Sequence, residues 1–273
     1  GTALVVRDDG YLLVTSDVVD DADTLTIWFD DGTSEPATLV GRDRVNDLAV
    51  VKIDRTGLPV AVLREGHTTD HLAFGDRTIV IDAAPTSGPT PALVEGFVSQ
   101  PSRAVAGDGT EMYGMIEVST RPQTAGSGTG RVLIDDEGVV VGLVTSRGQP
   151  GPATSGDDGL VLQFVVPIDH AKRAFDQLIT QGHVTTPVLG VRGVTEITGS
   201  EADAMGITGG LRTDVVERSA AEAGMRRHDV IVRFEGRPVT DLNDLRVQLR
   251  RHSPGDTVAI TYLRHGEEQM ALV

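Results

Sequence analysis

The sequence contains no cysteine, only two lysines and only ten aromatic residues among its 273 positions. Without cysteine the chain has no disulfide framework, no thiolate nucleophile and no cysteine-bound zinc site. No apolar run approaches the roughly 18 residues that a membrane-spanning helix needs, and we find no signal peptide. Because the chain lacks an initiator Met and opens on the strand-like run 1–6, we expect a targeting segment upstream of it.

Positive charge is scarce as well. Forty acidic side chains against 24 basic ones leave a net charge of −16. Nucleic acid and anionic membrane surfaces would both repel such a chain, so neither is expected as a partner. The acidic pairs mostly coincide with turn signals and lack the spacing of a calcium loop. The glycine-rich stretch 126–130 is not followed by Lys-Ser/Thr, as a phosphate loop would be, so the sequence predicts no metal and no cofactor.

Over its first 166 residues the chain has a series of short runs rich in Val, Ile, Leu and Thr. Pairs such as Asp31-Gly32 and Gly88-Pro89 interrupt these runs. Frequent short strands with few helices between them predict an all-β barrel or sandwich rather than βαβ units. The first clear helix begins at Pro167, and its apolar stripe should pack it back onto the β-structure.

The last third of the chain has a different character. Residues 183–187 look like a linker, and the remaining 86 residues mix short strands with two or three helices. The clearest helix covers residues 241–251, with Leu242, Leu245 and Leu249 on one face. We therefore expect one domain at residues 1–182 and a second at residues 188–273.

Several segments resemble the HtrA/Deg family of trypsin-like serine proteases, in their order and spacing. Residues 14–22 resemble the segment around the family's catalytic histidine, T-N-N-H-V-V-x-x-A, and residues 46–53 the segment around its catalytic aspartate. Residues 127–142 resemble the nucleophile segment G-N-S-G-G-P-L-V and the strand after it. The resemblance implies a mainly β fold, in which a chymotrypsin-like double six-stranded β-barrel is followed by a small α+β domain. The active site would lie in the cleft between the barrels.

The second domain is similar to the PDZ module of this family. Four residues stand at its carboxylate-binding loop: Val188, Leu189, Gly190 and Val191. The glycine lets the backbone wrap closely around a carboxylate. Such modules bind an extended C-terminal peptide as an added strand. The helix with Leu242 and Leu245 would form the other wall of the pocket, although a purely core role fits these leucines as well.

One member of the implied catalytic triad is missing. The resemblance implies that the triad residues follow the order His, Asp, Ser along the chain. Asp47 occupies the position of the catalytic aspartate. The first histidine is His67, which follows Asp47, and Asp17 occupies the place of the imidazole. A carboxylate, with an ordinary pKa of about 3.9, is a weak base for an alcohol. Two facing carboxylates also repel each other, which makes the pair less basic if one takes up a proton.

The nucleophile position is altered too. In the ungapped register Thr129 replaces the serine, and Arg131 and Val132 replace the family's second Gly and Pro. Threonine is β-branched and stiffer at χ1 than serine, so it crowds the attack geometry. A two-residue shift would instead place Ser127 at the nucleophile. The strand that follows fits the ungapped register better, and neither register supplies an imidazole.

These departures predict a catalytically inactive HtrA-like pseudoprotease, and the resemblance implies a location outside the cytoplasm, either periplasmic or membrane-anchored. It would bind peptides or partner proteins of the cell envelope through its PDZ domain, as a scaffold or regulator, and the resemblance is compatible with a homo-oligomer. Two alternatives stay open. One is an active hydrolase that pairs Thr129 or Ser127 with Asp17 or Asp47, and the other is a holdase-type chaperone that binds unfolded chains.

Overall fold

The computed structural model describes residues 1–83, 91–107, 110–121, 130–148 and 160–273. The chain divides into two compact units, which we call unit 1 (Gly1–Val184) and unit 2 (Thr185–Val273). None of the helices in the described segments is both long and apolar enough to cross a membrane.

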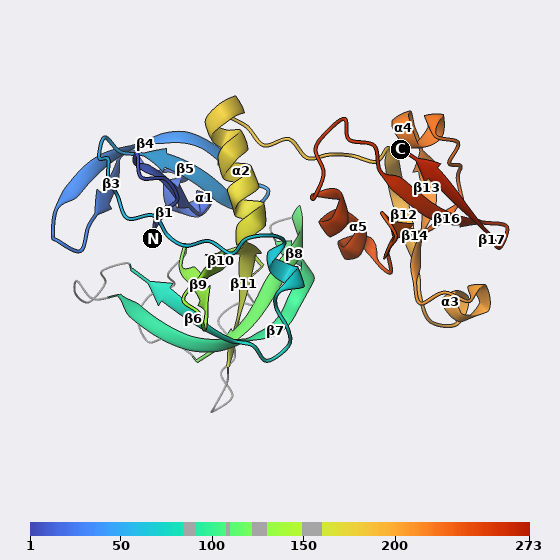
Figure 1. Ribbon diagram of the computed structural model, residues 1–273, viewed down its shortest axis with the longest axis horizontal. Helices are drawn as coiled ribbons and strands as arrows, with labels where there is room; N and C mark the ends of the chain where they lie inside the picture. The colour runs from blue at the N-terminus through green and yellow to red at the C-terminus, as the bar shows by residue number, and fades with distance from the viewer. Residues whose placement is uncertain (84–90, 108–109, 122–129, 149–159) are drawn as a thin grey trace. The chain divides into compact units, whose positions relative to one another are not determined.

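Unit 1 begins with an antiparallel sheet of five strands, drawn in blue in Figure 1. Its spatial order is β1 (Leu4–Val5), β2 (Tyr11–Val14), β5 (Leu48–Lys52), β4 (Ser34–Asp43) and β3 (Leu25–Trp28). The family resemblance led us to expect a closed six-stranded barrel here. Among the described residues the sheet instead has five strands and stays open, and its edge strands β1 and β3 each pair there with a single neighbour. The two-residue β1 also leaves few backbone groups for a further pairing.

The second sheet of unit 1 closes into a six-stranded barrel, as the resemblance implies. Its strands follow the order β10 (Val140–Val144), β11 (Val161–Pro167), β8 (Thr110–Thr120), β7 (Ala92–Gly107), β6 (Arg77–Asp82) and β9 (Val132–Asp135). Buried aliphatic side chains from these strands, such as Val80, Ile116 and Leu133, form one cluster. The expectation of a mainly β protein with a six-stranded barrel is therefore confirmed.

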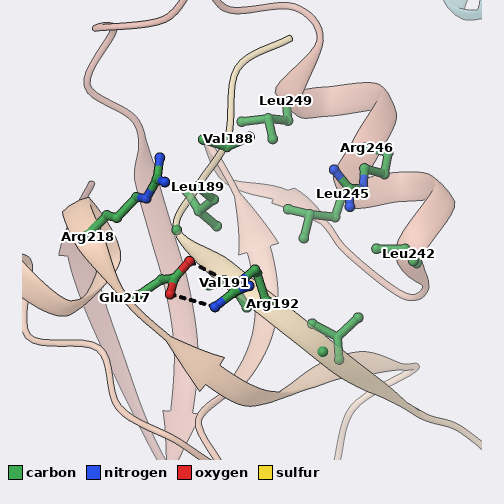
Figure 2. Close-up of a pocket in the computed structure, with 13 residues that line it drawn as sticks. Val188, Leu189, Val191, Arg192, Glu217, Arg218, Leu242, Leu245, Arg246 and Leu249 are labelled. Carbon is green, nitrogen blue, oxygen red and sulfur yellow. Dashed lines mark hydrogen bonds and ion pairs between the residues drawn. The ribbon is translucent and has the colours of Figure 1, made fainter. Parts of the chain in front are cut away.

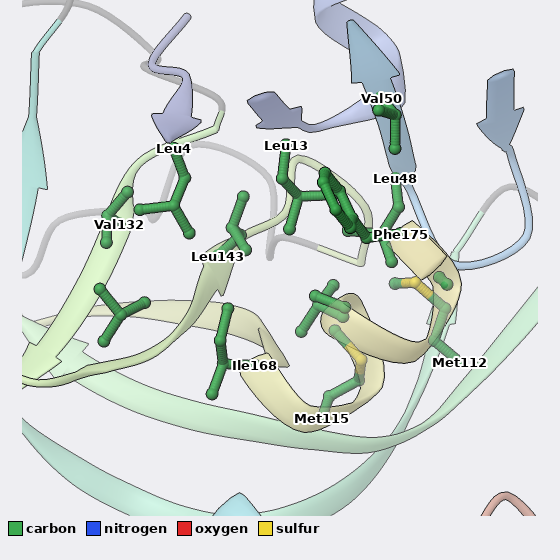
Figure 3. Close-up of a cluster of buried hydrophobic side chains, with 14 of the residues drawn as sticks. Leu4, Leu13, Leu48, Val50, Met112, Met115, Val132, Leu143, Ile168 and Phe175 are labelled. Atoms are coloured by element: carbon green, nitrogen blue, oxygen red, sulfur yellow. The ribbon is translucent and has the colours of Figure 1, made fainter. Parts of the chain in front are cut away.

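Helix α2 (Ile168–Gln181) joins the open sheet to the barrel. It begins after Pro167 and ends at Gly182, whose φ of 75° is the left-handed conformation of a helix stop. Its apolar stripe packs back onto both β-structures, as predicted from the sequence, and Figure 3 shows the shared cluster. The cluster contains Ile168 and Phe175 of the helix, Leu13 and Leu48 of the open sheet, and Met115 and Leu143 of the barrel. Two short elements, α1 (Ser16–Val19) and the 3₁₀ turn η1 (Thr68–Asp70), were not expected from the sequence.

Unit 2 is an antiparallel sheet with three helices. The sheet order is β12 (Val191–Ile197), β13 (Gly210–Val216), β14 (Val230–Phe234), β16 (Ala259–Arg264) and β17 (Glu267–Leu272), and β15 (Arg237–Pro238) pairs with β14. The helices are α3 (Gly199–Met205), α4 (Arg218–Glu222) and α5 (Leu242–Leu249). The Asp241 side chain caps α5 by accepting a hydrogen bond from the N–H of Asp244 at 2.8 Å. Because β12 lies at an edge of the sheet, one side of its backbone is open to a further strand.

Candidate functional site

The carboxylate of Asp47 is the centre of a buried polar cluster in unit 1. Asp47 has no exposed surface. The Ser16 hydroxyl and the Asp17 N–H donate to its Oδ1 atom at 2.9 and 3.4 Å. The Thr145 hydroxyl donates to Oδ2 at 2.5 Å, and the Nε atom of Arg147 lies 4.0 Å from Oδ1. Hydroxyl and amide donors therefore occupy both oxygens of the aspartate that, in the resemblance, would orient a histidine.

Three separate segments bring these groups together. Helix α1 supplies Ser16 and Asp17, the turn before β5 supplies Asp47, and the chain after β10 supplies Thr145 and Arg147. Helix α1 and β5 belong to the part with the open sheet, and β10 belongs to the barrel. The cluster therefore joins the two β-structures of unit 1, which is where the resemblance implies the ancestral active site.

The side chain of Asp17 is half-buried beside this cluster. Its Oδ1 atom is buried and has no hydrogen-bond partner among the residues that the structure describes. The pKa of Asp47 is raised above its usual value, and burial of the carboxylate is the largest cause. The hydrogen bonds from Thr145 and Ser16 lower this pKa, and the negative charge of Asp17 raises it.

Both candidate nucleophiles, Ser127 and Thr129, lie outside the described residues. The description resumes at Gly130, which has a φ of 76°. A Cβ atom placed on Gly130 would lie 3.0 Å from the carbonyl oxygen of Thr2 and 3.2 Å from the hydroxyl of Thr15. The residue after Thr129 is therefore packed against the residue that precedes α1.

The histidines lie elsewhere. All seven histidines of the chain fall within the described segments, and none of them is a hydrogen-bond partner of Asp47 there. His67, the first in the sequence, has its Nδ1 atom 3.4 Å from Oδ2 of Asp169 in α2. Within the described segments, no group of three or more His, Cys, Asp or Glu side chains could hold a metal ion.

The buried carboxylate of Asp47 predicts a distinctive pH dependence of stability. Because its pKa is raised in the folded state, the folded chain binds this proton more tightly than the unfolded chain does. The resulting stabilisation is fully present below the unfolded pKa and is lost as the pH rises through the raised folded pKa. We expect Asp47→Asn to flatten the decline of the urea midpoint of unit 1 as the pH rises above about 4, the ordinary pKa of an aspartate.

Asp23→Asn is the matched control for this measurement, since it removes one negative charge from an exposed position of the same unit. Parallel curves of urea midpoint against pH for the unmodified chain and Asp47→Asn would contradict the prediction.

In unit 2, the six residues proposed from the sequence to bind peptide all line one groove, which has a volume of about 550 Å³. They are Val188, Leu189, Gly190, Val191, Leu242 and Leu245. Figure 2 shows the loop with Val188 and Leu189 facing Leu245 and Leu249 of α5. Leu245 and Leu249 are also buried in the hydrophobic core of unit 2, so the leucines serve both the core and the pocket wall.

Gly190 holds the loop at one end of this groove. Its φ of 80° lies in the left-handed region, and a Cβ atom there would stand only 2.3 Å from the carbonyl oxygen of Glu217. The Glu217 N–H donates to the carbonyl of Gly190 at 2.8 Å, and the Ser219 hydroxyl donates to the carbonyl of Leu189 at 3.3 Å. No hydrogen bond from the N–H groups of Leu189 or Gly190 is made to another described residue.

Comparisons with known proteins agree with this architecture. A family model described as a trypsin-like peptidase domain matches residues 1–143, slightly more than half of the chain, and a PDZ domain model matches residues 187–273. A solved structure of the HtrA-type protease AlgW with a tripeptide superimposes with a TM-score of 0.73 at 28% identity, over 100% of this chain and 87% of that chain. The chain belongs to the HtrA family.

Other HtrA relatives support the same assignment. A probable periplasmic serine endoprotease (DegP-like) of Chlamydia muridarum is 32% identical over 98% of this chain and 52% of the relative. A probable periplasmic serine protease (do/HhoA-like) of Haemophilus influenzae is 26% identical over 98% of this chain and 56% of the relative. The HtrA-type protease AlgW with a decapeptide has a TM-score of 0.66 at 26% identity, covering 100% of this chain and 81% of that chain. The present chain thus spans about half the length of these curated relatives.

Sequence reasoning missed several residues of both parts of this HtrA-type chain. They are Ser16, Thr145 and Arg147 around Asp47, and Arg192, Glu217, Arg218 and Arg246 along the groove. A signal was available for two of them, because Ser16 directly precedes Asp17 and Thr145 directly follows the apolar strand β10. The charged groove residues have no comparable signal, since only the placement of α5 against β12 puts them in one groove.

Proposed function

We propose that this HtrA-type chain binds the C-terminal ends of peptides and proteins in the groove of unit 2, and that unit 1 does not cleave them by the histidine-dependent mechanism. The observation that carries the proposal is the groove itself. An edge strand, an apolar pocket and a glycine-shaped loop meet there, and these are the three elements that capture of a peptide terminus needs.

The binding mechanism follows from the geometry. An incoming peptide would extend the sheet by pairing with the open edge of β12, so that main-chain hydrogen bonds supply much of the affinity. Its terminal carboxylate would accept hydrogen bonds from the N–H groups of Leu189 and Gly190, which have no acceptor among the described residues. Its last side chain would enter the apolar space between Leu189 and Leu245.

Two features of the relatives support this proposal. The AlgW structures are described as complexes with a tripeptide and a decapeptide. The curated relatives are named as probable periplasmic proteins, which supports a location outside the cytoplasm for this chain as well. We propose a role as a peptide-binding scaffold or regulator of the cell envelope.

The proposed lack of cleavage rests on the chemistry around Asp47. A histidine-dependent protease needs an imidazole that accepts the nucleophile's proton near neutral pH. This chain has Asp17 beside Asp47, and the hydroxyls of Ser16 and Thr145, not an imidazole, donate hydrogen bonds to the Asp47 carboxylate. Asp47 therefore links the open sheet and the barrel through its hydrogen bonds with Ser16 and Thr145.

An active peptidase is the second candidate function. The observation that favours it is that the curated relatives are named as a probable serine endoprotease and a probable serine protease. In this case Thr129 or Ser127 would be the nucleophile, and Asp47, whose pKa is raised, or Asp17 would take its proton.

One experiment with two measurements tests the proposal. A fluorescent decapeptide that ends in valine is titrated with the chain, once with a free terminal carboxylate and once with a C-terminal amide. We expect micromolar binding of the free acid and a loss of about tenfold or more on amidation, because the amide removes the charge that the loop N–H groups bind. Mass spectrometry of the same peptide and of casein should show no cleavage, and a fluorophosphonate probe should leave the chain unlabelled.

Two results would contradict the proposal. Equal binding of acid and amide across a peptide library would refute terminus capture, and suppression of aggregation of many unrelated unfolded proteins would then favour the holdase alternative. Saturable labelling that disappears in Thr129→Ala or Ser127→Ala would establish the active peptidase.

A further inference from the structure

One arginine of the groove in unit 2 has no partner among the residues that the structure describes. Arg218 lines the groove together with Leu189 and Gly190 of the glycine loop. Its side chain is exposed, and it makes no hydrogen bond or ion pair with another described residue. Figure 2 shows its guanidinium turned toward Leu189. The positive charge of Arg218 is therefore available to an anion that binds at the loop.

The residues on both sides of Arg218 are hydrogen-bonded to the loop. The Glu217 N–H donates to the carbonyl of Gly190 at 2.8 Å, and the Ser219 hydroxyl donates to the carbonyl of Leu189 at 3.3 Å. Leu189 and Gly190 are the residues whose N–H groups are proposed to bind the peptide carboxylate. The backbone of Arg218 is thus held next to the proposed carboxylate position, and its long side chain starts there.

Arg218 also has a backbone conformation that residues with a side chain rarely adopt. Its φ of 52° lies in the left-handed region that favours glycine. This conformation is unfavourable for a residue with a Cβ atom, and strained residues of this kind concentrate at ligand-binding sites. An arginine stands where glycine would avoid the strain, which favours a role for its side chain.

A second arginine neutralises Glu217, the one acidic side chain that lines the groove in the described part of the chain. Unpaired, this glutamate would repel a carboxylate bound at the loop. The Nε atom of Arg192 lies 2.8 Å from Oε1 of Glu217, and a second hydrogen bond of 2.9 Å joins the two side chains (Figure 2). This two-bond pair compensates the charge of Glu217, while the charge of Arg218 stays uncompensated.

We propose that Arg218 pairs with the terminal carboxylate of the bound peptide, and that Arg192 supports this pairing by neutralising Glu217. The guanidinium of Arg218 and the N–H groups of the loop then bind the same carboxylate, by charge and by hydrogen bonds. The ligand is thus an anionic chain end, and amidated ends and internal segments lack the charge that this site binds. The inference rests on the proposed peptide binding and names the residue that supplies its electrostatic part.

The test uses the full 273-residue chain and the valine-ending decapeptide as free acid and as amide, at 50 and at 500 mM NaCl. We expect Arg218→Gln to weaken binding of the free acid by about three- to tenfold and to leave binding of the amide unchanged, because only the acid carries the charge. Salt should weaken binding of the acid to the unmodified chain and should have a smaller effect in Arg218→Gln. Arg218→Lys should keep the salt dependence.

The role of Arg192 is tested by a pair of variants. Arg192→Gln should weaken binding of the free acid by about two- to threefold, since Glu217 then presents an unpaired negative charge beside the carboxylate. Adding Glu217→Gln to Arg192→Gln should return the affinity toward that of the unmodified chain. If the ion pair served only to stabilise the groove, the double variant would bind no better than Arg192→Gln, and this result would overturn the role of Arg192.

Two matched controls lie in the same unit and do not line the groove. Arg227 is exposed and, like Arg218, has no partner among the described residues, and Arg233 forms an exposed ion pair with Glu268, like that of Arg192. Arg227→Gln and Arg233→Gln should therefore keep the affinity for the free acid.

An unchanged ratio of acid to amide affinity in Arg218→Gln would overturn the inference. If the unmodified chain still prefers the acid in that case, the proposed function stands and only the role of Arg218 fails. If the unmodified chain binds acid and amide equally, or binds neither, both the inference and the proposed function fail.

Discussion

Replacing Gly190 with alanine is expected to lower the affinity for a free C-terminal peptide by about tenfold or more. The Cβ atom would stand 2.3 Å from the carbonyl oxygen of Glu217, whereas real Cβ contacts essentially never fall under 3.0 Å, so the loop must move. The left-handed backbone adds a cost of about 1–2 kcal/mol for a residue with a side chain. A shift of this kind misaligns the N–H groups of Leu189 and Gly190, because hydrogen bonds weaken steeply with distance and angle. Fluorescence anisotropy with the valine-ending decapeptide measures the loss.

Gly206→Ala separates the effect of the Cβ clash in the loop from the effect of backbone strain. Gly206 also has a left-handed φ, 69°, but a Cβ atom there meets nothing within 4 Å. It ends helix α3, and it does not line the groove. We expect Gly206→Ala to lower the urea midpoint through backbone strain and to leave peptide affinity unchanged. A similar loss of affinity in both variants would mean that general destabilisation, rather than the shape of the loop, controls binding.

A large loss of stability is expected when Asp82 in the barrel is replaced with alanine. Asp82 is the last residue of β6, and its Oδ2 atom accepts a hydrogen bond of 3.0 Å from Nε of Arg131, just before β9. The two side chains are only 10% and 7% exposed. Truncating the aspartate leaves the guanidinium charge buried without this partner, which costs about 3–5 kcal/mol. For a unit of this size we expect the melting temperature to fall by roughly 10 °C, measured by circular dichroism.

A double variant tests whether the cost comes from the uncompensated charge. Asp82→Leu combined with Arg131→Met replaces both partners with apolar side chains, and it should lose less stability than Asp82→Ala. Glu95→Ala is the control, because Glu95 pairs with Arg77 of the same strand β6 while both side chains are mostly exposed. This exposed pair should contribute no measurable stability. If Glu95→Ala and Asp82→Ala lowered the melting temperature equally, burial of the Asp82–Arg131 pair would not explain the loss of stability.

Much of the fold was predictable because it depends on local patterns. The stripe from Ile168 to Leu178 repeats with the period of a helix, so its length and buried face followed from the sequence, and Gly182 marked its end. The short helix α1 was missed, since its four residues are too few to show a period. The open sheet was also missed, because the family resemblance does not report how β1 pairs at the edge.

Some features of the candidate sites also followed from the sequence, and others required the tertiary structure. By itself, the sequence established that no histidine precedes Asp47 and that the loop with Gly190 has the form of a carboxylate-binding segment. These conclusions need only residue identities and their order along the chain. Only the tertiary structure revealed that Thr145, 98 residues from Asp47, donates a hydrogen bond to its carboxylate, and that Arg218 and Arg246 line one groove. Such contacts depend on how distant strands pair and on where a helix packs, and the spacing of residues along the chain does not encode them directly.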